Sequence, residues 1–105
     1  MGAGKCASQA GHAFLGAFFV AQAQRAPAAH AYFSDPPGTK VTLQASSQEL
    51  FQIKQLAEAN GLPTFLVIDS GCPNFFGGEP IPTALGIGPA TKDELPKKMR
   101  RLKLL

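Results

Sequence analysis

Residue types that mark specialised protein classes are scarce in this sequence. No Trp occurs among its 105 residues, and its two cysteines, Cys6 and Cys72, lie far apart. Such a pair excludes a scaffold held by several disulfides and a zinc site built from several cysteines. Charged residues make up only 16% of the chain, and its share of Leu, Ile, Val and Phe exceeds that of a disordered chain. The length therefore predicts one domain over residues 1–105 with a real core.

The chain also lacks an apolar run long enough to cross a membrane. Residues 13–20 form the strongest apolar run, well short of the roughly 20 residues that a spanning helix needs. With Lys5 before it and Ala21-Gln22-Ala23 after it, the same run has the outline of a secretory signal peptide. Because the polar residues Gln9 and His12 stand directly before the run, we expect it to belong to the folded domain instead.

Helix composition, capping patterns and helix-ending residues predict four helices. Ser46 and Thr91 are each followed three residues later by Glu, which is the pattern of a capping box. Pro27 and Gly61 are typical of helix ends. The predicted helices cover residues 4–24, 27–33, 47–60 and 91–100, with a turn over 34–38.

Four segments have strand character: residues 40–45, 64–68, 83–89 and 102–105. The run 64–68 is apolar throughout, which is typical of an interior strand that has a neighbour on each side. A loop over 70–82 follows it. Helices that alternate with strands along the chain predict an α/β layered domain.

Three polar residues share one face of the first predicted helix. Lys5, Gln9 and His12 are spaced four and three residues apart, so helical geometry places them together. This face is either solvated or the wall of a site. The Gly-rich entry with Lys5 favours an anion at the helix N-terminus, although Cys6 stands where a nucleotide-binding P-loop has Ser or Thr.

Two further features have both a structural and a functional interpretation. Asp69 directly follows the apolar strand, where residues of open α/β sheets commonly line a site, but an Asp there also caps turns. The C-terminal stretch is basic, which suits either a solvated helix that complements its own dipole or a surface that contacts phosphates. The net charge of +3 permits a polyanionic partner without requiring one.

Four short blocks of the chain together resemble the type-2 peptidyl-tRNA hydrolases. Residues 1–13 resemble that family's M-G-x-G-K-x-x-x-Q-x-x-H-A signature, and Asp69-Ser70-Gly71 resembles its D-A-G. Residues 83–89 resemble its T-x-L-G-I-G-P, and residues 102–104 its closing L-K-L. Each block is short, but all four occur in the family's order and at its approximate spacing.

The resemblance implies an α/β three-layer sandwich with a mixed β-sheet of about four strands and helices on both faces. It implies hydrolysis of the ester between peptide and tRNA, in the cytoplasm or alternatively the mitochondrion, with peptidyl-tRNA as partner and no membrane, metal or organic cofactor. By position, the catalytic residues would be Lys5, Asp69 and Thr83. Substrate would be bound by Gln9, His12, Lys97, Lys98 and Arg101.

Elementary chemistry suggests roles for the three catalytic candidates. Ester hydrolysis needs an activated water, stabilisation of the oxyanion and protonation of the leaving group. Asp69 is suited to orient or deprotonate the water, and Lys5 to stabilise negative charge or hold the terminal phosphate. Thr83 is suited to donate a hydrogen bond.

The chain departs from the family pattern in two places. Members of the family usually begin with an apolar strand before the first motif, whereas here Met1 starts the motif. We therefore expect an N-terminally truncated domain that is unstable, aggregates or recruits a strand from another copy, as in a strand-mediated dimer. Cys72-Pro73 replaces a family site hydroxyl. A non-catalytic relative that binds tRNA or a protein partner is the alternative function.

Overall fold

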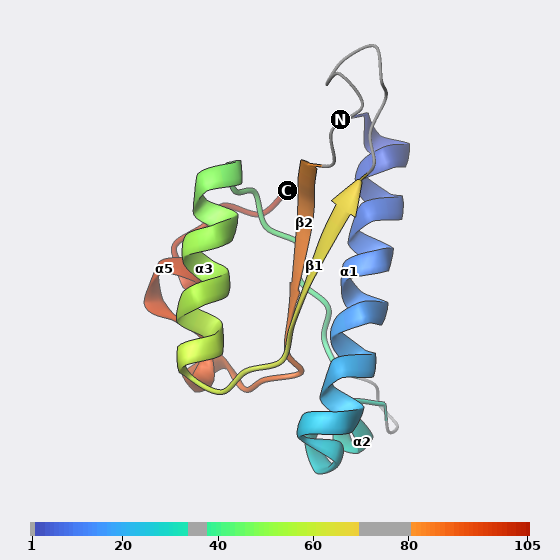
Figure 1. The fold of residues 1–105 in the computed structure, drawn as a ribbon, viewed down its shortest axis with the longest axis vertical. Helices are drawn as coiled ribbons and strands as arrows, with labels where there is room; N and C mark the ends of the chain where they lie inside the picture. Colours follow the sequence, from blue (N-terminus) through green and yellow to red (C-terminus); the bar gives the residue numbers. More distant parts are fainter. Residues whose placement is uncertain (1, 34–37, 70–80) are drawn as a thin grey trace.

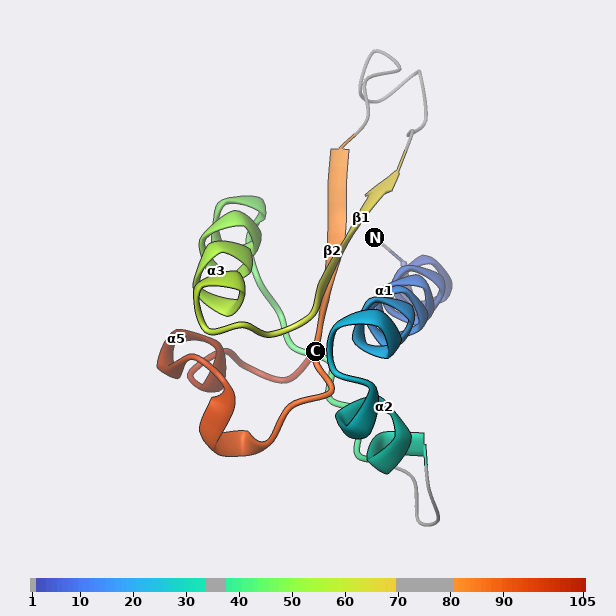
Figure 2. The same ribbon diagram turned by 60° about the horizontal axis from the view of Figure 1, so that its bottom comes forward.

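Helices lie on either side of a two-stranded antiparallel sheet (Figures 1 and 2). The computed structural model of the chain describes residues 2–33, 38–69 and 81–105. The elements in chain order are α1 Ala3–Gln24, α2 Ala26–Phe33, α3 Ser47–Ala59, β1 Thr64–Asp69, β2 Ile81–Ile87, the 3₁₀ turn η1 Lys92–Glu94, and α5 Lys97–Arg100. The α/β class predicted from the sequence is confirmed.

The helix predictions hold for three of the four helices. α1 ends at Gln24, three residues before Pro27. Before α3, the Ser46 hydroxyl accepts from the Glu49 N–H at 3.1 Å and the Glu49 carboxylate accepts from the Ser46 N–H at 2.8 Å. After α3, Gly61 has φ of +72°, a conformation that glycine adopts without strain.

The predicted helix over 91–100 is wrong in its extent. Thr91 and Glu94 do form the capping box, but only a 3₁₀ turn follows it before helix resumes as α5. Pro96 explains the break, because proline has no N–H to donate and disfavours helical backbone in the residue before it.

β1 and β2 form the sheet, and a shift in their register leaves one residue of β2 without a partner residue on β1. Thr64 lies opposite Ile87 and Asp69 lies opposite Ile81, but the register shifts between Val67 and Ile68. Their partners are Ala84 and Pro82, so Thr83 has no residue opposite it. Such a bulge turns a side chain away from the regular alternation of a strand.

The described residues give a smaller sheet than the expected one of about four strands. Segments 40–45 and 102–105 do not pair with β1 or β2, and they meet each other in one antiparallel bridge, Leu43 to Leu104. Among the residues that the structure describes, β1 has a partner strand on one edge only, and Phe65 and Ile68 are 39% and 49% exposed. The interior position expected for residues 64–68 is therefore not seen among the described residues. Strand-forming residues indicate a preference for extended backbone, but a strand joins a sheet only where a neighbouring strand is available to pair with it.

Small residues bring α1 against the sheet. Ala13, Gly16, Ala17 and Ala21 are the buried residues of this helix. A Cβ atom at Gly86 of β2 would lie 2.1 Å from the carbonyl oxygen of Ala13. Since a carbon and an oxygen cannot approach so closely, the helix can sit at this distance only because residue 86 is glycine.

An ion pair joins the end of α1 to η1. The Arg25 guanidinium donates to the Glu94 carboxylate at 2.6 Å and to the Pro89 carbonyl at 3.1 Å. The hydrogen bond from Arg25, followed by that from the Thr91 N–H, lowers the pKa of Glu94 to about 2 from an ordinary value of 4.5. This pair ties the C-terminal third of the chain to α1.

We expect the protein to lose stability in acid through this pair. Because the pKa of Glu94 is lower in the folded state, its contribution is complete above about pH 4.5 and is lost as the pH falls toward 2. Both side chains are about one-third exposed, so added salt should weaken the effect. Urea unfolding of Glu94→Gln should depend less on pH between 5 and 2 than that of the parent, and parallel curves would contradict the assignment.

Candidate active site

Three of the residues predicted to form the site lie at one end of the sheet. In Figure 1 the N-terminal turns of α1 are at the same end as the last residue of β1 and the first residues of β2. Gln9 comes from α1, Thr83 from β2, and Asp69 is the last residue of β1. Because α1 contacts both strands, residues far apart in the sequence meet here.

A hydrogen bond joins Thr83 to Gln9. The Thr83 hydroxyl donates to the Gln9 side-chain oxygen at 3.0 Å, and its oxygen lies 3.4 Å from the Val67 carbonyl oxygen. The two residues are 74 positions apart, and both are half-buried. The bulge at Thr83 coincides with this contact, so the irregularity in β2 serves to direct a hydroxyl toward α1.

Lys5 and His12 flank Gln9 on α1. Each is about one turn from Gln9, as the sequence spacing predicts, and both are exposed. The first turn of α1 has no acidic residue, and its N-cap residue is Gly2, which has no side chain to cap the helix N–H groups. The positive end of the helix dipole is therefore not offset by a nearby carboxylate of that turn, and together with Lys5 it favours an anion at this end.

The strand pairing places Asp69 beside this group. Its backbone is opposite Ile81, two residues from Thr83 along β2. The neighbouring motif residues Ser70 and Gly71, and the departure at Cys72-Pro73, lie outside the described residues.

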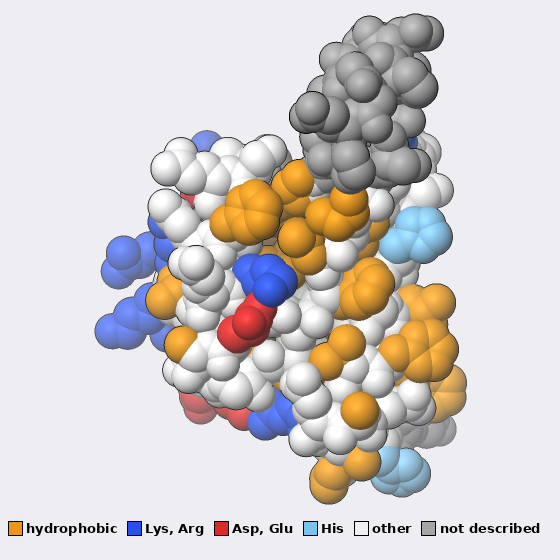
Figure 3. Space-filling view, in the orientation of Figure 1, with side chains coloured by type: hydrophobic (Ala, Val, Ile, Leu, Met, Phe, Trp, Pro, Cys, Tyr) orange, Lys and Arg blue, Asp and Glu red, His pale blue; other side chains and the backbone are white. Residues whose placement is uncertain are grey.

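The structure does not bring the basic C-terminal residues to this end of the sheet. Lys97 and Lys98 lie on α5 and Arg101 follows it, and all three are exposed. α5 lies beside α3, on the other side of the sheet from α1 (Figures 1 and 2), and Lys98 donates to Gln52 of α3. Figure 3 shows several Lys and Arg side chains projecting on this side of the molecule, and others elsewhere on the same face. Any ligand that contacts both groups must extend across the molecule.

Comparison with known proteins identifies the family. A model of the family described as peptidyl-tRNA hydrolase PTH2 matches residues 1–105. The chain belongs to this family. Curated proteins named peptidyl-tRNA hydrolase match as well. The protein of Methanococcus vannielii is 39% identical over 106 residues, covering 100% of this chain and 89% of the relative. That of Methanopyrus kandleri is 38% identical over 103 residues, covering 97% and 85%.

The PTH2 match covers every residue assigned to the site from the sequence. Another curated peptidyl-tRNA hydrolase, from Halobacterium salinarum, is 38% identical over 91 residues, with 86% of this chain and 76% of the relative covered. The resemblance seen in four short motifs is thus confirmed along the chain as a whole. Within the described residues no helix is long and apolar enough to span a bilayer. Among the same residues, no three His, Cys, Asp or Glu side chains gather as a metal site would require.

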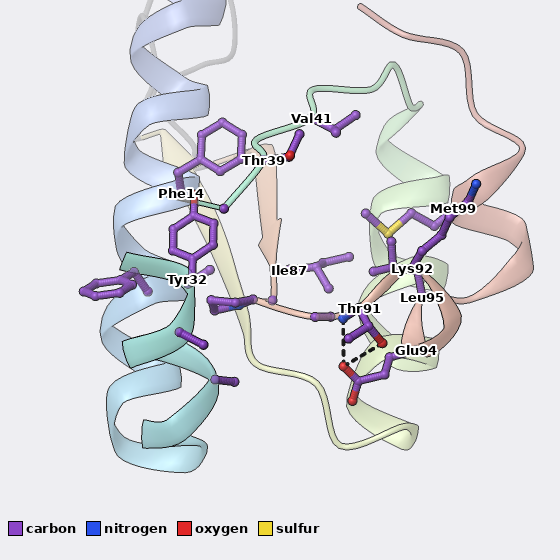
Figure 4. Close-up of a pocket in the computed structure, with 18 of the residues that line it drawn as sticks. Phe14, Tyr32, Thr39, Val41, Ile87, Thr91, Lys92, Glu94, Leu95 and Met99 are labelled. Atoms are coloured by element: carbon purple, nitrogen blue, oxygen red, sulfur yellow. Dashed lines mark hydrogen bonds between the residues drawn. The ribbon is translucent and has the colours of Figure 1, made fainter. Parts of the chain in front are cut away.

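Sequence reasoning missed a cavity of this PTH2 chain. It has a volume of about 830 Å³ and lies between α1, α2, the segment after residue 38 and the C-terminal part of the chain (Figure 4). Phe14, Phe18 and Tyr32 line one side, and Ile87, at the opposite end of β2 from Ile81, borders it. The cavity is therefore separate from the Gln9 and Thr83 contact. Only the pairing of distant segments creates it, so no local sequence signal marked it.

Proposed function

We propose that this PTH2 chain hydrolyses the ester bond that joins a peptide to the 3′-terminal ribose of tRNA, and so recycles tRNA from aborted translation. The family match over residues 1–105 carries this proposal. It favours catalysis over a role in binding alone, because the family and its curated relatives are named for the hydrolase. We propose a single domain that acts in the cytoplasm, where translation supplies such a substrate, with the mitochondrion as the alternative.

The proposed reaction needs a water molecule directed at the ester carbonyl. Asp69 is our candidate for the base, since a carboxylate can accept the proton of the attacking water. The developing oxyanion needs positive charge or hydrogen-bond donors, and Lys5 lies at the same end of the molecule in the positive field of α1. His12 is assigned to the wall that holds the substrate.

The hydrogen bond between Thr83 and Gln9 refines their roles. A hydroxyl has one hydrogen, and that of Thr83 is directed to the Gln9 oxygen. The Thr83 oxygen then serves as an acceptor for water or substrate, not as the donor expected from the sequence. The same contact orients the Gln9 amide, whose NH₂ group becomes the donor on this wall.

Release of an N-acetylated amino acid from its tRNA tests the proposed function. The purified chain should convert N-acetyl-aminoacyl-tRNA to free tRNA and N-acetyl amino acid with turnover, and a heat-denatured sample should not. If the chain shifts the tRNA in a binding assay yet releases nothing, the binding alternative is correct instead.

Thr83→Val should lower kcat about fivefold and change KM little. Valine has nearly the shape of threonine, so the variant removes the hydrogen bond to Gln9 without opening a cavity, and one neutral hydrogen bond is worth about 1 kcal/mol. Thr83→Ser keeps the hydroxyl and should retain most of the activity. Equal rates for the Val and Ser variants would show that the hydroxyl has no role in the reaction.

The basic surface on α5 should contribute to tRNA affinity through phosphates. We propose that Lys97, Lys98 and Arg101 contact tRNA at a distance from the reacting ester. Each phosphate contact adds nearly one unit to the slope of log affinity against log salt. Lys97→Gln/Lys98→Gln should therefore reduce that slope by roughly 1.5–2, whereas Lys54→Gln, which breaks an ion pair with Glu58 on α3, should leave it unchanged. An unaltered slope in the double variant would remove α5 from the interface.

We also propose that the active form has the fuller, three-layer arrangement with about four strands. Segments 40–45 and 102–105 already approach each other, with the Gln44 N–H donating to the Lys103 carbonyl at 2.8 Å and the Leu105 N–H to the Thr42 carbonyl at 3.0 Å. In that arrangement both segments would be strands of the same sheet that contains β1 and β2.

A further inference from the structure

Two large apolar side chains are exposed on the outer face of α1. Leu15 and Phe19 are 56% and 60% exposed, and they are four residues apart, so they are neighbours on the helix surface. No Asp, Glu, Lys or Arg occurs between residues 6 and 24. The outer face of a helix in a globular protein normally carries charged and polar residues, so this face is suited to an apolar partner.

These side chains continue the face of α1 that carries the predicted site residues. His12 precedes Leu15 by about one turn and Phe19 by about two, because seven residues are close to two turns of 3.6 residues. Lys5 and Gln9 lie on the same side of the helix, nearer its N-terminus. The exposed apolar residues therefore begin next to the site and extend toward the C-terminal end of α1.

Strand β1 adds a third apolar side chain to this surface. The Phe65 ring lies against Gly16, where a Cβ atom would be 2.2 Å from Cδ2 of the ring, and Phe65 is 39% exposed. Gly16 directly follows Leu15 and precedes Phe19 by three residues. Figure 3 shows hydrophobic side chains over the part of the molecule where α1 and β1 lie. Leu15, Phe19 and Phe65 together are called the apolar stripe below.

The two parts of the proposed substrate must leave the reacting carbonyl in different directions, because the peptide is joined to its carbon and the ribose to the ester oxygen. The tRNA is proposed to extend toward α5, which lies on the other side of the sheet from α1 (Figures 1 and 2). The apolar stripe lies on the α1 side and is thus available to the peptide. From His12 to Phe19 the helix rises about 10 Å, which is the length of about three extended peptide residues.

We propose that the apolar stripe binds the last few residues of the substrate's peptide, so that the chain favours peptidyl-tRNA whose peptide ends in apolar residues. This inference rests on the proposed hydrolase function, since it names the part of that substrate which the site selects. A tenfold preference corresponds to about 1.4 kcal/mol. Burial of only about 55 Å² of apolar surface supplies that much at roughly 25 cal/mol per Å², so contact with part of the stripe is sufficient.

Binding of analogues that cannot be hydrolysed tests the proposal without turnover. Each probe is a tRNA whose 3′-terminal ribose carries a peptide through an amide bond, acetyl-Leu-Leu-Phe in one and acetyl-Ser-Ser-Phe in the other. Both share the tRNA and the residue next to the ribose, so they differ only where the stripe would contact the peptide. We expect the full chain to bind the Leu-Leu analogue about tenfold more tightly. Equal dissociation constants would overturn the peptide subsite, whereas an ester-linked substrate that is bound but not cleaved would overturn only the hydrolase function.

A pair of double variants locates the preference. Leu15→Gln/Phe19→Gln replaces both exposed side chains with a good helix former and should reduce the preference to within twofold. Phe51→Gln/Leu56→Gln removes the same two residue types from α3, where they are 49% and 41% exposed, and should keep the tenfold preference. An α1 variant that keeps the preference would overturn the assignment. Equal binding of both analogues by the parent, with self-association that the α1 variant loses, would instead assign the stripe to a contact between two copies of the chain.

Discussion

Asp69→Asn is expected to lower the rate of peptide release by 100-fold or more. The substitution keeps the size of the side chain but replaces a carboxylate, which can take a proton from water, with a carboxamide, which cannot. A positioned general base typically contributes a factor of about 10²–10⁴. The effect should appear in kcat, measured as release of N-acetyl amino acid, since KM reflects contacts to tRNA that lie elsewhere.

Asp93→Asn is the matched control for this prediction. Asp93 is an exposed residue of η1, in the part of the chain that follows β2, and its substitution removes the same charge. Its rate should stay within about twofold of the parent. An Asp69→Asn variant that keeps a tenth or more of the parent rate would remove Asp69 from the role of base.

Gly86→Ala should destabilise the fold, because the added methyl group has no room between β2 and α1. The new Cβ would lie 2.1 Å from the Ala13 carbonyl oxygen and 3.1 Å from the Ala17 Cβ, so α1 must move away from β2. Overpacking of this kind typically costs about 1–3 kcal/mol, against a total stability of about 5–15 kcal/mol for a small domain. The same movement separates Gln9 from Thr83, so kcat should fall as well.

Gly11→Ala, on the helix α1 that packs against Gly86, provides the comparison. A Cβ at this position meets no atom within 4 Å, and alanine in a helix is favoured over glycine by about 0.5–1 kcal/mol. Urea unfolding should therefore show this variant to be more stable than the parent and Gly86→Ala to be less stable. Similar midpoints for the two variants would contradict the close contact between α1 and β2.

Local signals in the sequence predicted local structure well. The capping box at Ser46 and the glycine at position 61 mark the limits of α3, and both act as expected. The spacing of Lys5, Gln9 and His12 also placed them correctly on one helix face. Each of these predictions depends only on residues within two or three helical turns, where short-range geometry decides the outcome.

Features that depend on contacts between distant segments were harder to predict from the sequence. The run 64–68 was expected to be an interior strand, yet the identity of its neighbours depends on residues 14 to 23 positions further along the chain. The bulge at Thr83 and the cavity beside Ile87 likewise arise from pairing between segments. The site residues came from the resemblance to PTH2 proteins and not from periodicity; the structure brings Thr83 and Gln9 into contact, and the catalytic roles stay predictions.

The most direct measurement of the central claim is a single turnover in ¹⁸O-labelled water. An excess of the chain is mixed with N-acetyl-aminoacyl-tRNA, and the released N-acetyl amino acid and the tRNA 3′ end are analysed by mass spectrometry. Attack of water on the ester carbonyl predicts one ¹⁸O in the carboxylate of the released amino acid and none in the ribose hydroxyl. A substrate that stays intact while bound to the chain, or a label in the ribose, would contradict the account.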